Sequence, residues 1–401
     1  MNQLSARGTM AASCMSFFAL GLITAALGPA LPDLAANASS NLATIGAIFT
    51  ALFLGGFITQ LIAGPLNDRL GQRPVLLVGI GLLAAGICGI AISHALPLTL
   101  ACALVAGLGH GAIDVSTNVL IAEVFAARSA SALNLLNVFF GVGAVAGPAI
   151  AGLTLRVWGT ALPVLWLGAG LMLVQAPFVR RLASAPSVAH HDDLATPGLA
   201  LLRSPLLWVF GGLLLLYVGT ETGIGGWTTT YMERTTTIGA AAAALVTAGF
   251  WLALTGGRVA GALIGARVAA GVLLRLSLAG ALAGAVLLAI SPGNAALTVV
   301  AVILIGFCFG PIFPTALSIV TATFRRAPGT AASVVVAMGS LGGMLLPWAQ
   351  GTLLESRGPS ASTVLVAAGA LSMLAIELGR GLLNGRQSTV VSCQLPHATD
   401  N

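Results

Sequence analysis

The chain is organised as long apolar runs separated by short polar breaks. Each run approaches the length of about 20 residues that an α-helix needs to cross the hydrocarbon core of a bilayer. Counting these runs predicts an all-α integral membrane protein with twelve transmembrane helices. The expected spans are 11–34, 43–63, 74–93, 97–122, 132–154, 161–179, 205–230, 239–263, 271–290, 295–323, 329–353 and 360–383.

Composition excludes a soluble globular protein. Of the 401 residues, 57% are hydrophobic and only 7% are charged, and the mean hydropathy is +1.01. Soluble domains carry roughly 25% charged residues. The first apolar run, of about 24 residues, is longer than the apolar core of a cleavable signal peptide, so we expect it to be retained as the first span.

The arginines predict the orientation in the membrane. All 17 basic residues are Arg, and an even number of spans places both termini on one side. That side carries fourteen of them, including Arg258, and the other carries Arg156, Arg234 and Arg357. Because cytoplasmic loops are rich in basic residues, we expect both termini in the cytoplasm and the chain in an inner (plasma) membrane. Topology then explains the formal charge of +6, and no nucleic-acid partner is expected.

A polar stretch midway along the chain divides it into two halves. We predict an N-terminal six-helix bundle (1–180), a cytoplasmic linker (181–204), a C-terminal six-helix bundle (205–384) and a cytoplasmic tail (385–401). Weak echoes between the halves, such as "GVGAVAGPAIAG" and "GSLGGMLLPWAQG", indicate a parallel repeat. The linker residues His190, His191, Asp192 and Asp193 are interpreted as solvated, and no metal site is expected.

The most specific local pattern is "GPLNDRLGQRPVLL" between the second and third runs. Gly64 and Gly71 permit tight turns, and Asp68 can pair with Arg69 or Arg73. The stretch resembles the signature loop of the major facilitator superfamily, although glutamine replaces one basic residue of that signature. The resemblance implies a transporter of two pseudo-symmetric six-helix bundles. It also implies that these five residues form a cytoplasmic latch that gates transport.

Two acidic residues lie well inside expected spans. A charged side chain at that depth costs on the order of 2.5–3.5 kcal/mol on insertion scales, so Asp114 and Glu221 call for a function. His110 lies one helical turn from Asp114 and could tune or relay its proton. Glu377 is expected to form an interfacial pair with Arg380. We expect no Arg inside the spans to neutralise Asp114 or Glu221, which favours reversible protonation; a polar cluster that only holds helices together is the alternative.

Other polar and aromatic residues extend this candidate site. Asn118 continues the stripe of Asp114 along one helix, and Asn134 and Asn137 share a face of the next. These three amides are expected to hydrogen-bond substrate hydroxyls. Trp227 follows a Gly-Gly pair and could stack on a sugar ring; an aromatic residue at the membrane boundary is the alternative.

Three stretches carry a narrower resemblance: "GAIDVSTN", "LNLLNVFFGVGA" and "YVGTETGIGGW". They are similar to the fucose/glucose/galactose–proton symporter branch and its bacterial glucose-porter relatives. The resemblance aligns Asp114 and Asn118 with the acid and Asn of the fourth helix of that branch, and Asn134 and Asn137 with the amides of the fifth. The second acid that the fucose symporter carries in its first helix is missing here, and Glu221 could take its place.

These features favour a proton-coupled secondary transporter of a small polar solute, with a sugar as the best candidate. The expected partners are the solute and the lipid bilayer, and the proton gradient stands in place of a cofactor. We expect a monomer, and no motif argues for an enzyme. Efflux of drugs or metabolites by proton antiport remains the alternative, supported by the Gly147-Pro148 motif of the fifth span.

Overall fold

The computed structural model describes residues 5–125, 129–182, 201–265, 267–324 and 328–393, and these form helices joined by short connections. The first half contains α1 (Ala6–Asn37), α2 (Leu42–Ile45), α3 (Ala47–Leu70), α4 (Gln72–Ile92), α5 (Leu96–Phe125), α6 (Ser129–Trp158) and α7 (Leu162–Val179). The second contains α9 (Pro205–Thr235), α10 (Ala240–Gly265), α11 (Ala270–Ile290), α12 (Ala295–Phe309), α13 (Ile312–Thr323), α14 (Pro328–Ser356) and α15 (Pro359–Cys393).

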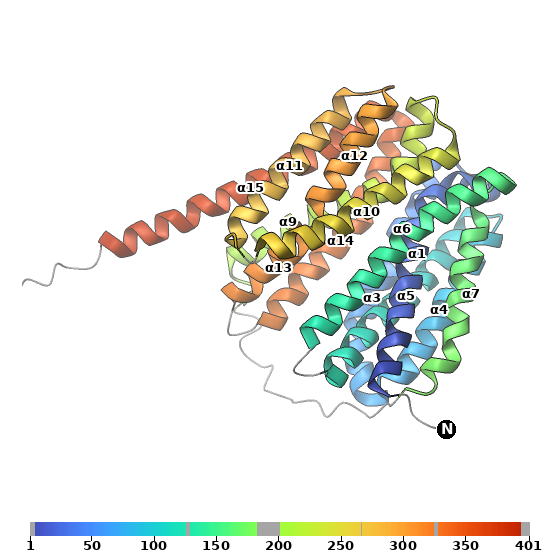
Figure 1. The fold of residues 1–401 in the computed structure, drawn as a ribbon, viewed down its shortest axis with the longest axis horizontal. Coiled ribbons are helices and arrows are strands. Elements are labelled where there is room, and N and C mark those ends of the chain that lie inside the picture. The colour runs from blue at the N-terminus through green and yellow to red at the C-terminus, as the bar shows by residue number, and fades with distance from the viewer. Residues whose placement is uncertain (1–4, 126–128, 183–200, 266, 325–327, 394–401) are drawn as a thin grey trace, which may run out of the picture.

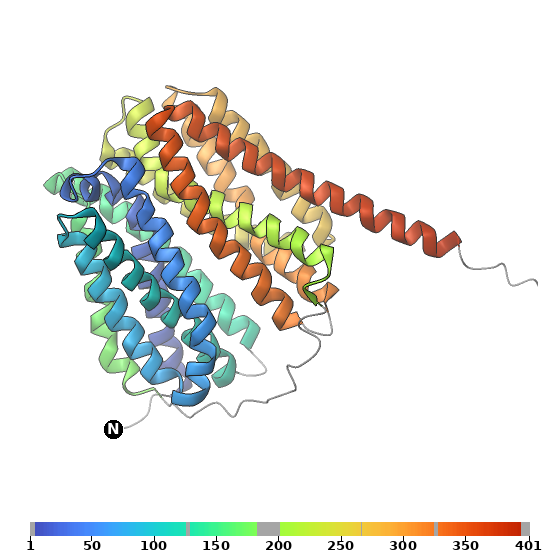
Figure 2. The ribbon, with the colours of Figure 1, turned by 180° about the vertical axis from the view of Figure 1, so that it is seen from behind.

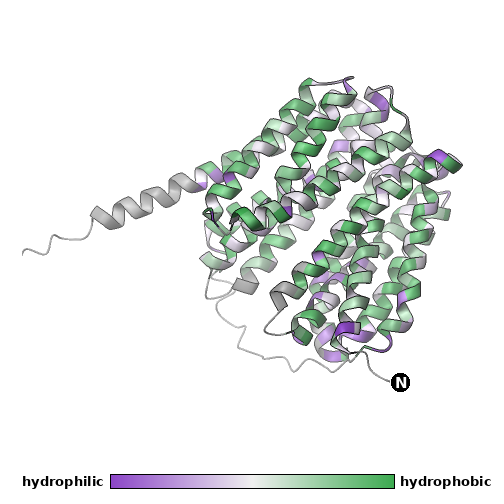
Figure 3. Cartoon of the chain, in the orientation of Figure 1, coloured by the Kyte–Doolittle hydropathy of each residue, from purple (hydrophilic) through white to green (hydrophobic). Residues whose placement is uncertain are grey.

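Twelve candidate membrane spans lie in the described part of the chain, which confirms the expected number. The run expected at 295–323 is divided into α12 and α13 at Gly310 and Pro311, because proline has no N–H to continue the helical hydrogen bonding. Large apolar side chains face outward, with Ile290 72% and Leu263 69% exposed. Such a surface suits lipid and not water, and the helices of both halves are coloured mainly as hydrophobic in Figure 3.

The helices form two bundles that lie side by side (Figure 1). The side at which α1 begins is here named the amino-terminal side, and the side at which it ends is named the distal side. Seen from behind, the bundles meet at their distal ends and separate toward the amino-terminal side (Figure 2). Contacts between the bundles include a hydrogen bond of 2.7 Å from the Thr50 hydroxyl to the Met344 carbonyl.

The same helix pairing recurs in both bundles. In the first, a Cβ on Gly143 of α6 would collide with the backbone of Phe18 in α1. In the second, a Cβ on Gly342 of α14 would collide with the backbone of Leu215 in α9. Small residues of this kind let transmembrane helices approach closely. The pairs α1–α6 and α9–α14 occupy equivalent places in the two halves, as expected for a parallel repeat.

Gly143→Ala is expected to lower stability by about 1–3 kcal/mol, the usual cost of overpacking a close contact. The added methyl group meets backbone that can move only if α1 and α6 separate. Thermal unfolding of the detergent-solubilised protein measures the effect. Gly170→Ala is the matched control because a Cβ there meets nothing within 4 Å. Equal melting temperatures for the two variants would contradict this account of the α1–α6 contact.

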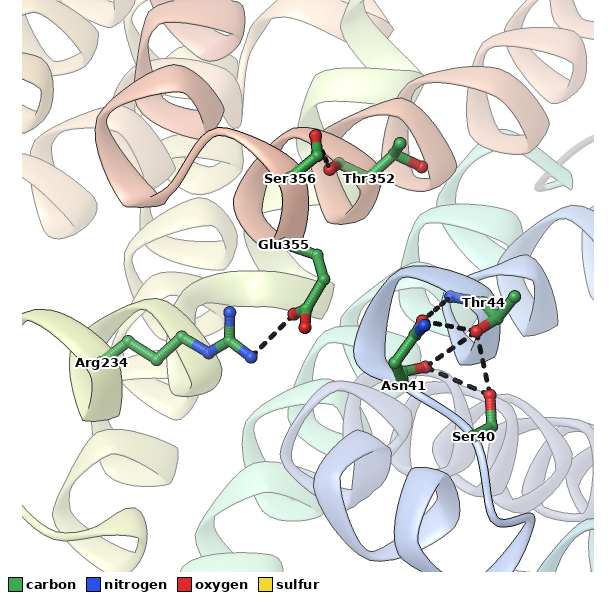
Figure 4. A network of polar contacts seen from close by, with 7 residues as sticks. All are labelled: Ser40, Asn41, Thr44, Arg234, Thr352, Glu355 and Ser356. Carbon is green, nitrogen blue, oxygen red and sulfur yellow. Dashed lines mark hydrogen bonds and ion pairs between the residues drawn. The ribbon is translucent and has the colours of Figure 1, made fainter.

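Two ion pairs in the second bundle differ sharply in burial. Arg234 of α9 reaches Glu355 of α14 at 2.8 Å on the distal side, where both side chains are about one-third exposed (Figure 4). Glu377 of α15 is only 1% exposed and accepts from Arg380 through both of its oxygens, from Nε at 2.7 Å and from Nη2 at 2.5 Å. The Arg380 guanidinium also lies 5.2 Å from the centre of the Phe210 ring. The expected pairing of Glu377 with Arg380 is confirmed.

Glu377→Gln is expected to destabilise the protein by about 3–5 kcal/mol, because it leaves a buried guanidinium without its counter-charge. Glu355→Gln is the matched control and is expected to cost about 0–1 kcal/mol, as exposed pairs do. Thermal or denaturant unfolding of both variants under the same conditions shows which substitution lowers the free energy of unfolding more. A larger loss of stability for Glu355→Gln than for Glu377→Gln would contradict the prediction that the buried pair stabilises the protein more than the exposed one.

Candidate transport site

The polar stripe of α5 lies in the middle of the span. The Asn118 side-chain amide donates to the Asp114 carboxylate at 3.0 Å and to the Asp114 backbone carbonyl at 2.9 Å. All three side chains of the stripe are partly exposed, whereas Ile113 and Thr117 beside them are buried. His110 makes no hydrogen bond or ion pair with any described residue, so the structure does not join it to Asp114.

The Asp114 carboxylate keeps free acceptor capacity. Its contact with Asn118 is with one oxygen, and a carboxylate offers about four acceptor positions. No described Arg lies within ion-pair distance of it. A carboxylate at this depth, paired only with a neutral amide, is suited to bind a proton or another small cation.

The two asparagines of α6 are less informative. Asn137 has an exposed side chain that donates to the Leu133 carbonyl of its own helix at 3.1 Å. The side chain of Asn134 lies outside the described part of the structure. The structure therefore shows Asn137 bonded within α6 and not to the α5 stripe.

The second acid has a cationic neighbour that the sequence did not reveal. Glu221 of α9 lies 3.7 Å from the guanidinium of Arg258 of α10, with 12% and 29% of these side chains exposed. The expectation that no intramembrane cation accompanies Glu221 is wrong. The orientation argument counts Arg258 among the charges of the cytoplasmic side although it falls within the run expected at 239–263; in the structure it lies inside α10, which continues to Gly265.

Trp227 lies in the contact between the bundles. Its side chain is fully buried, and its indole N–H donates to the Pro347 carbonyl of α14 at 2.8 Å. The ring packs between Gly46 of the first bundle and Gly351 of the second. Nearby, a Cβ on Gly28 of α1 would lie 2.6 Å from the Gly225 carbonyl of α9. We name this set of contacts the distal seal; its members are Gly28, Gly46, Phe49, Gly225, Gly226 and Trp227.

The loop between α3 and α4 is held by polar contacts within the first bundle. Gly71 has φ of +78°, a conformation that favours glycine. Gln72 is buried and donates to Glu123 of α5 at 2.9 Å, and Arg73 donates to the Arg180 carbonyl at 3.4 Å. The glutamine that departs from the family signature thus tethers α4 to α5.

The other residues of the signature stretch lie inside α3, which continues to Leu70, so the turn expected at Gly64 is not present and Gly71 alone makes the turn. Ser116 of α5 donates to the Asn67 side chain of α3 at 2.9 Å, a contact that sequence reasoning missed. The side chain of Arg69 is exposed. The surroundings of Gly64 and Asp68 lie outside the described side chains, as do the linker residues 190–193.

Twelve candidate spans in two repeated bundles, with charged residues inside the spans, are typical of a membrane transporter. Residues 13–377 match the sequence model of the Major Facilitator Superfamily. The chain belongs to this family, which is a family of transporters and not of enzymes.

Similar proteins extend the comparison. "Sodium-dependent glucose transporter 1" of Danio rerio is 27% identical over 382 residues, covering 86% of this chain and 64% of that protein. "Uncharacterized MFS-type transporter YfkL" of Bacillus subtilis is 29% identical over 134 residues, which is 33% of this chain and 34% of the relative. The matched regions thus span less than two thirds of these relatives.

Solved structures share the fold at low identity. The nucleoside transporter NupG matches with a TM-score of 0.76 and 14% identity, over 93% of this chain and 97% of that one. FucP in the outward conformation matches with a TM-score of 0.64 and 18% identity, over 92% and 98% of the two chains.

Proposed function

We propose that this chain couples the movement of a small polar solute, with a sugar as the best candidate, to a proton gradient by alternating access. The carrying observation is the Asp114–Asn118 pair in the middle of α5: a carboxylate held by a neutral amide, with acceptor capacity left for a proton. Asn118 also retains its amide oxygen for a solute hydroxyl. The similarity to proteins named as glucose transporters supports a sugar.

The proposed orientation places the amino-terminal side in the cytoplasm. The excess of Arg on that side supports it. In this orientation the distal seal closes the outer side of an inner-membrane protein, and the α3–α4 loop acts as the cytoplasmic latch. We further propose that the chain acts as a monomer, with bundle boundaries near residues 180 and 205.

Uptake into proteoliposomes tests the proposal. Labelled D-glucose is the probe, with an inward pH gradient, an inward sodium gradient or neither. Accumulation driven by the pH gradient supports proton symport. Accumulation driven only by the sodium gradient would identify sodium, and not the proton, as the coupling ion. The name of the Danio rerio relative favours this outcome. Solute expulsion under an inward pH gradient would support the antiport alternative.

A further inference from the structure

The polar cluster between α9 and α10 contains more donors than its partners use. Its charged members are Glu221 and Arg258, and Tyr217 lies one helical turn before Glu221 on the same face of α9. The Tyr217 hydroxyl interacts electrostatically with both charged groups. The ring of Tyr217 packs on Phe309 and Phe313, so α12 and α13 bring apolar groups to the cluster.

The Glu221–Arg258 contact is looser than the other ion pairs of the described chain. Arg234 approaches Glu355 at 2.8 Å, and Arg380 binds Glu377 through two nitrogens at 2.7 and 2.5 Å. The 3.7 Å separation of Glu221 and Arg258 exceeds a hydrogen-bond distance. The loosest pair therefore lies inside the membrane, where an unsatisfied guanidinium is most costly. If Glu221 and Arg258 only stabilised the fold, we would expect their contact to be at least as short as those of the other two pairs.

Two neutral donors of this region also make no hydrogen bond of normal geometry with a described residue, although Tyr217 lies close enough to Glu221 and Arg258 to interact with both. They are the Tyr217 hydroxyl and the Trp251 indole N–H, and both atoms are buried. Trp251 precedes Arg258 by about two turns on α10, and its ring packs on Gly225, one turn after Glu221. Buried donors without partners are rare in native proteins and call for an explanation, such as a ligand that is absent.

These donors face the interior of the bundle and not the lipid. Trp251 and Leu254 on the same side of α10 are buried, whereas Leu252 and Val259 on the other side are more than half exposed. Beside Arg258, the break at Gly310 brings α12 against α10, since a Cβ on Gly310 would lie 2.5 Å from the Arg258 backbone nitrogen. The helix break thus packs against the backbone of α10 at Arg258.

We propose that Arg258, with Tyr217, binds a carboxylate of the transported solute in competition with Glu221, and that Trp251 donates to a hydroxyl of the same solute. The three side chains offer guanidinium, hydroxyl and indole donors, and a carboxylate supplies acceptors in the planar geometry that guanidinium binds. This inference rests on the proposed transport of a polar solute and narrows its class to hydroxylated carboxylates, the sugar acids. Arg258 is then a specificity-determining residue of the second bundle, opposite the proton-binding carboxylate of the first.

Matched sugars provide the test. D-glucose and D-glucuronate differ only in the oxidation of C6 to a carboxylate. Their binding to the purified full-length protein is measured by isothermal titration calorimetry, and their uptake is measured in proteoliposomes. We expect glucuronate to bind at least roughly tenfold more tightly than glucose, the effect of one charge-assisted hydrogen bond. Arg258→Gln is expected to remove this preference, so that glucuronate binds no more tightly than glucose.

Three further variants separate recognition from folding. Arg275→Gln changes an exposed Arg of α11 and is expected to keep the preference for glucuronate. Arg258→Lys keeps the positive charge and is expected to retain part of the preference for glucuronate. Glu221→Gln removes the competitor and is expected to tighten glucuronate binding several-fold.

The outcomes are distinct. Glucose uptake with no preference for glucuronate, unchanged by Arg258→Gln, overturns the carboxylate site and leaves the proposed function standing. Failure of the folded protein to bind or carry either sugar overturns both. Weaker glucuronate binding by Glu221→Gln would show that Glu221 is a ligand and not a competitor, which also overturns the proposal.

Discussion

Asp114→Asn is expected to abolish accumulation of solute driven by a pH gradient. The substitution is nearly isosteric and leaves an oxygen that Asn118 can still donate to, so the local geometry of α5 persists. The amide cannot bind and release a proton near neutral pH, so the solute loses its link to the gradient. We expect accumulation in proteoliposomes to fall to the level of empty vesicles.

Exchange of solute without a gradient separates coupling from binding. Asp114→Asn proteoliposomes preloaded with unlabelled solute should still take up labelled solute, because exchange needs alternating access but no net proton movement. Glu355→Gln, another carboxylate-to-amide change, lies in an exposed ion pair on the distal side and should leave both assays unaltered. If Asp114→Asn still accumulates solute against a gradient, Asp114 is not the proton carrier.

The two intramembrane acids have different surroundings, which suggests different tasks. Asp114 is paired only with a neutral amide, whereas Glu221 has a guanidinium at 3.7 Å that stabilises its ionised form. A group that must gain and lose a proton is better served by the first environment. Under the two proposals above, the coupling ion binds in the first bundle and the charge of the solute is recognised in the second.

Local features of the candidate site could be predicted from the sequence. The placement of Asp114 and Asn118 on one face of α5 follows from their spacing of four residues, although the same spacing does not bring His110 into contact with Asp114. The twelve spans follow from the length of the apolar runs, because the bilayer fixes the length of a helix that crosses it. Neither depends on how the helices pack.

The features that sequence reasoning missed depend on that packing. Arg258 and Glu221 meet because α9 and α10 are antiparallel neighbours in a particular register, which no local pattern specifies. The burial of Trp227 arises from glycines more than 100 residues away on either side of it along the chain, Gly46 and Gly351. A signal for Arg258 did exist, since it falls inside the run expected at 239–263, but the assignment of loop charges placed it at the membrane boundary.

Gly28→Val is expected to reduce transport by more than about tenfold by holding the distal seal open. A Cβ at this position would lie 2.6 Å from the Gly225 carbonyl and 2.7 Å from the Gly226 carbonyl. Both are backbone atoms, so no change of rotamer relieves the contact, and α1 must move away from α9. The state described here, with the bundles in contact at the distal side, then becomes inaccessible, and alternating access requires both states.

The displacement is measurable with spin labels on Ala36 and Arg357, which are exposed on the distal side of the two bundles. In a background without native cysteines, Gly28→Val should shift the distance between the labels to longer values. Gly212→Val is the matched control, because a Cβ at Gly212 in α9 meets nothing within 4 Å. If Gly28→Val lowers thermal stability but leaves the distance distribution unchanged, the distal seal is only a packing contact and the prediction is wrong. A longer distance together with lost transport would instead show that the glycine contact between α1 and α9 forms the outer gate.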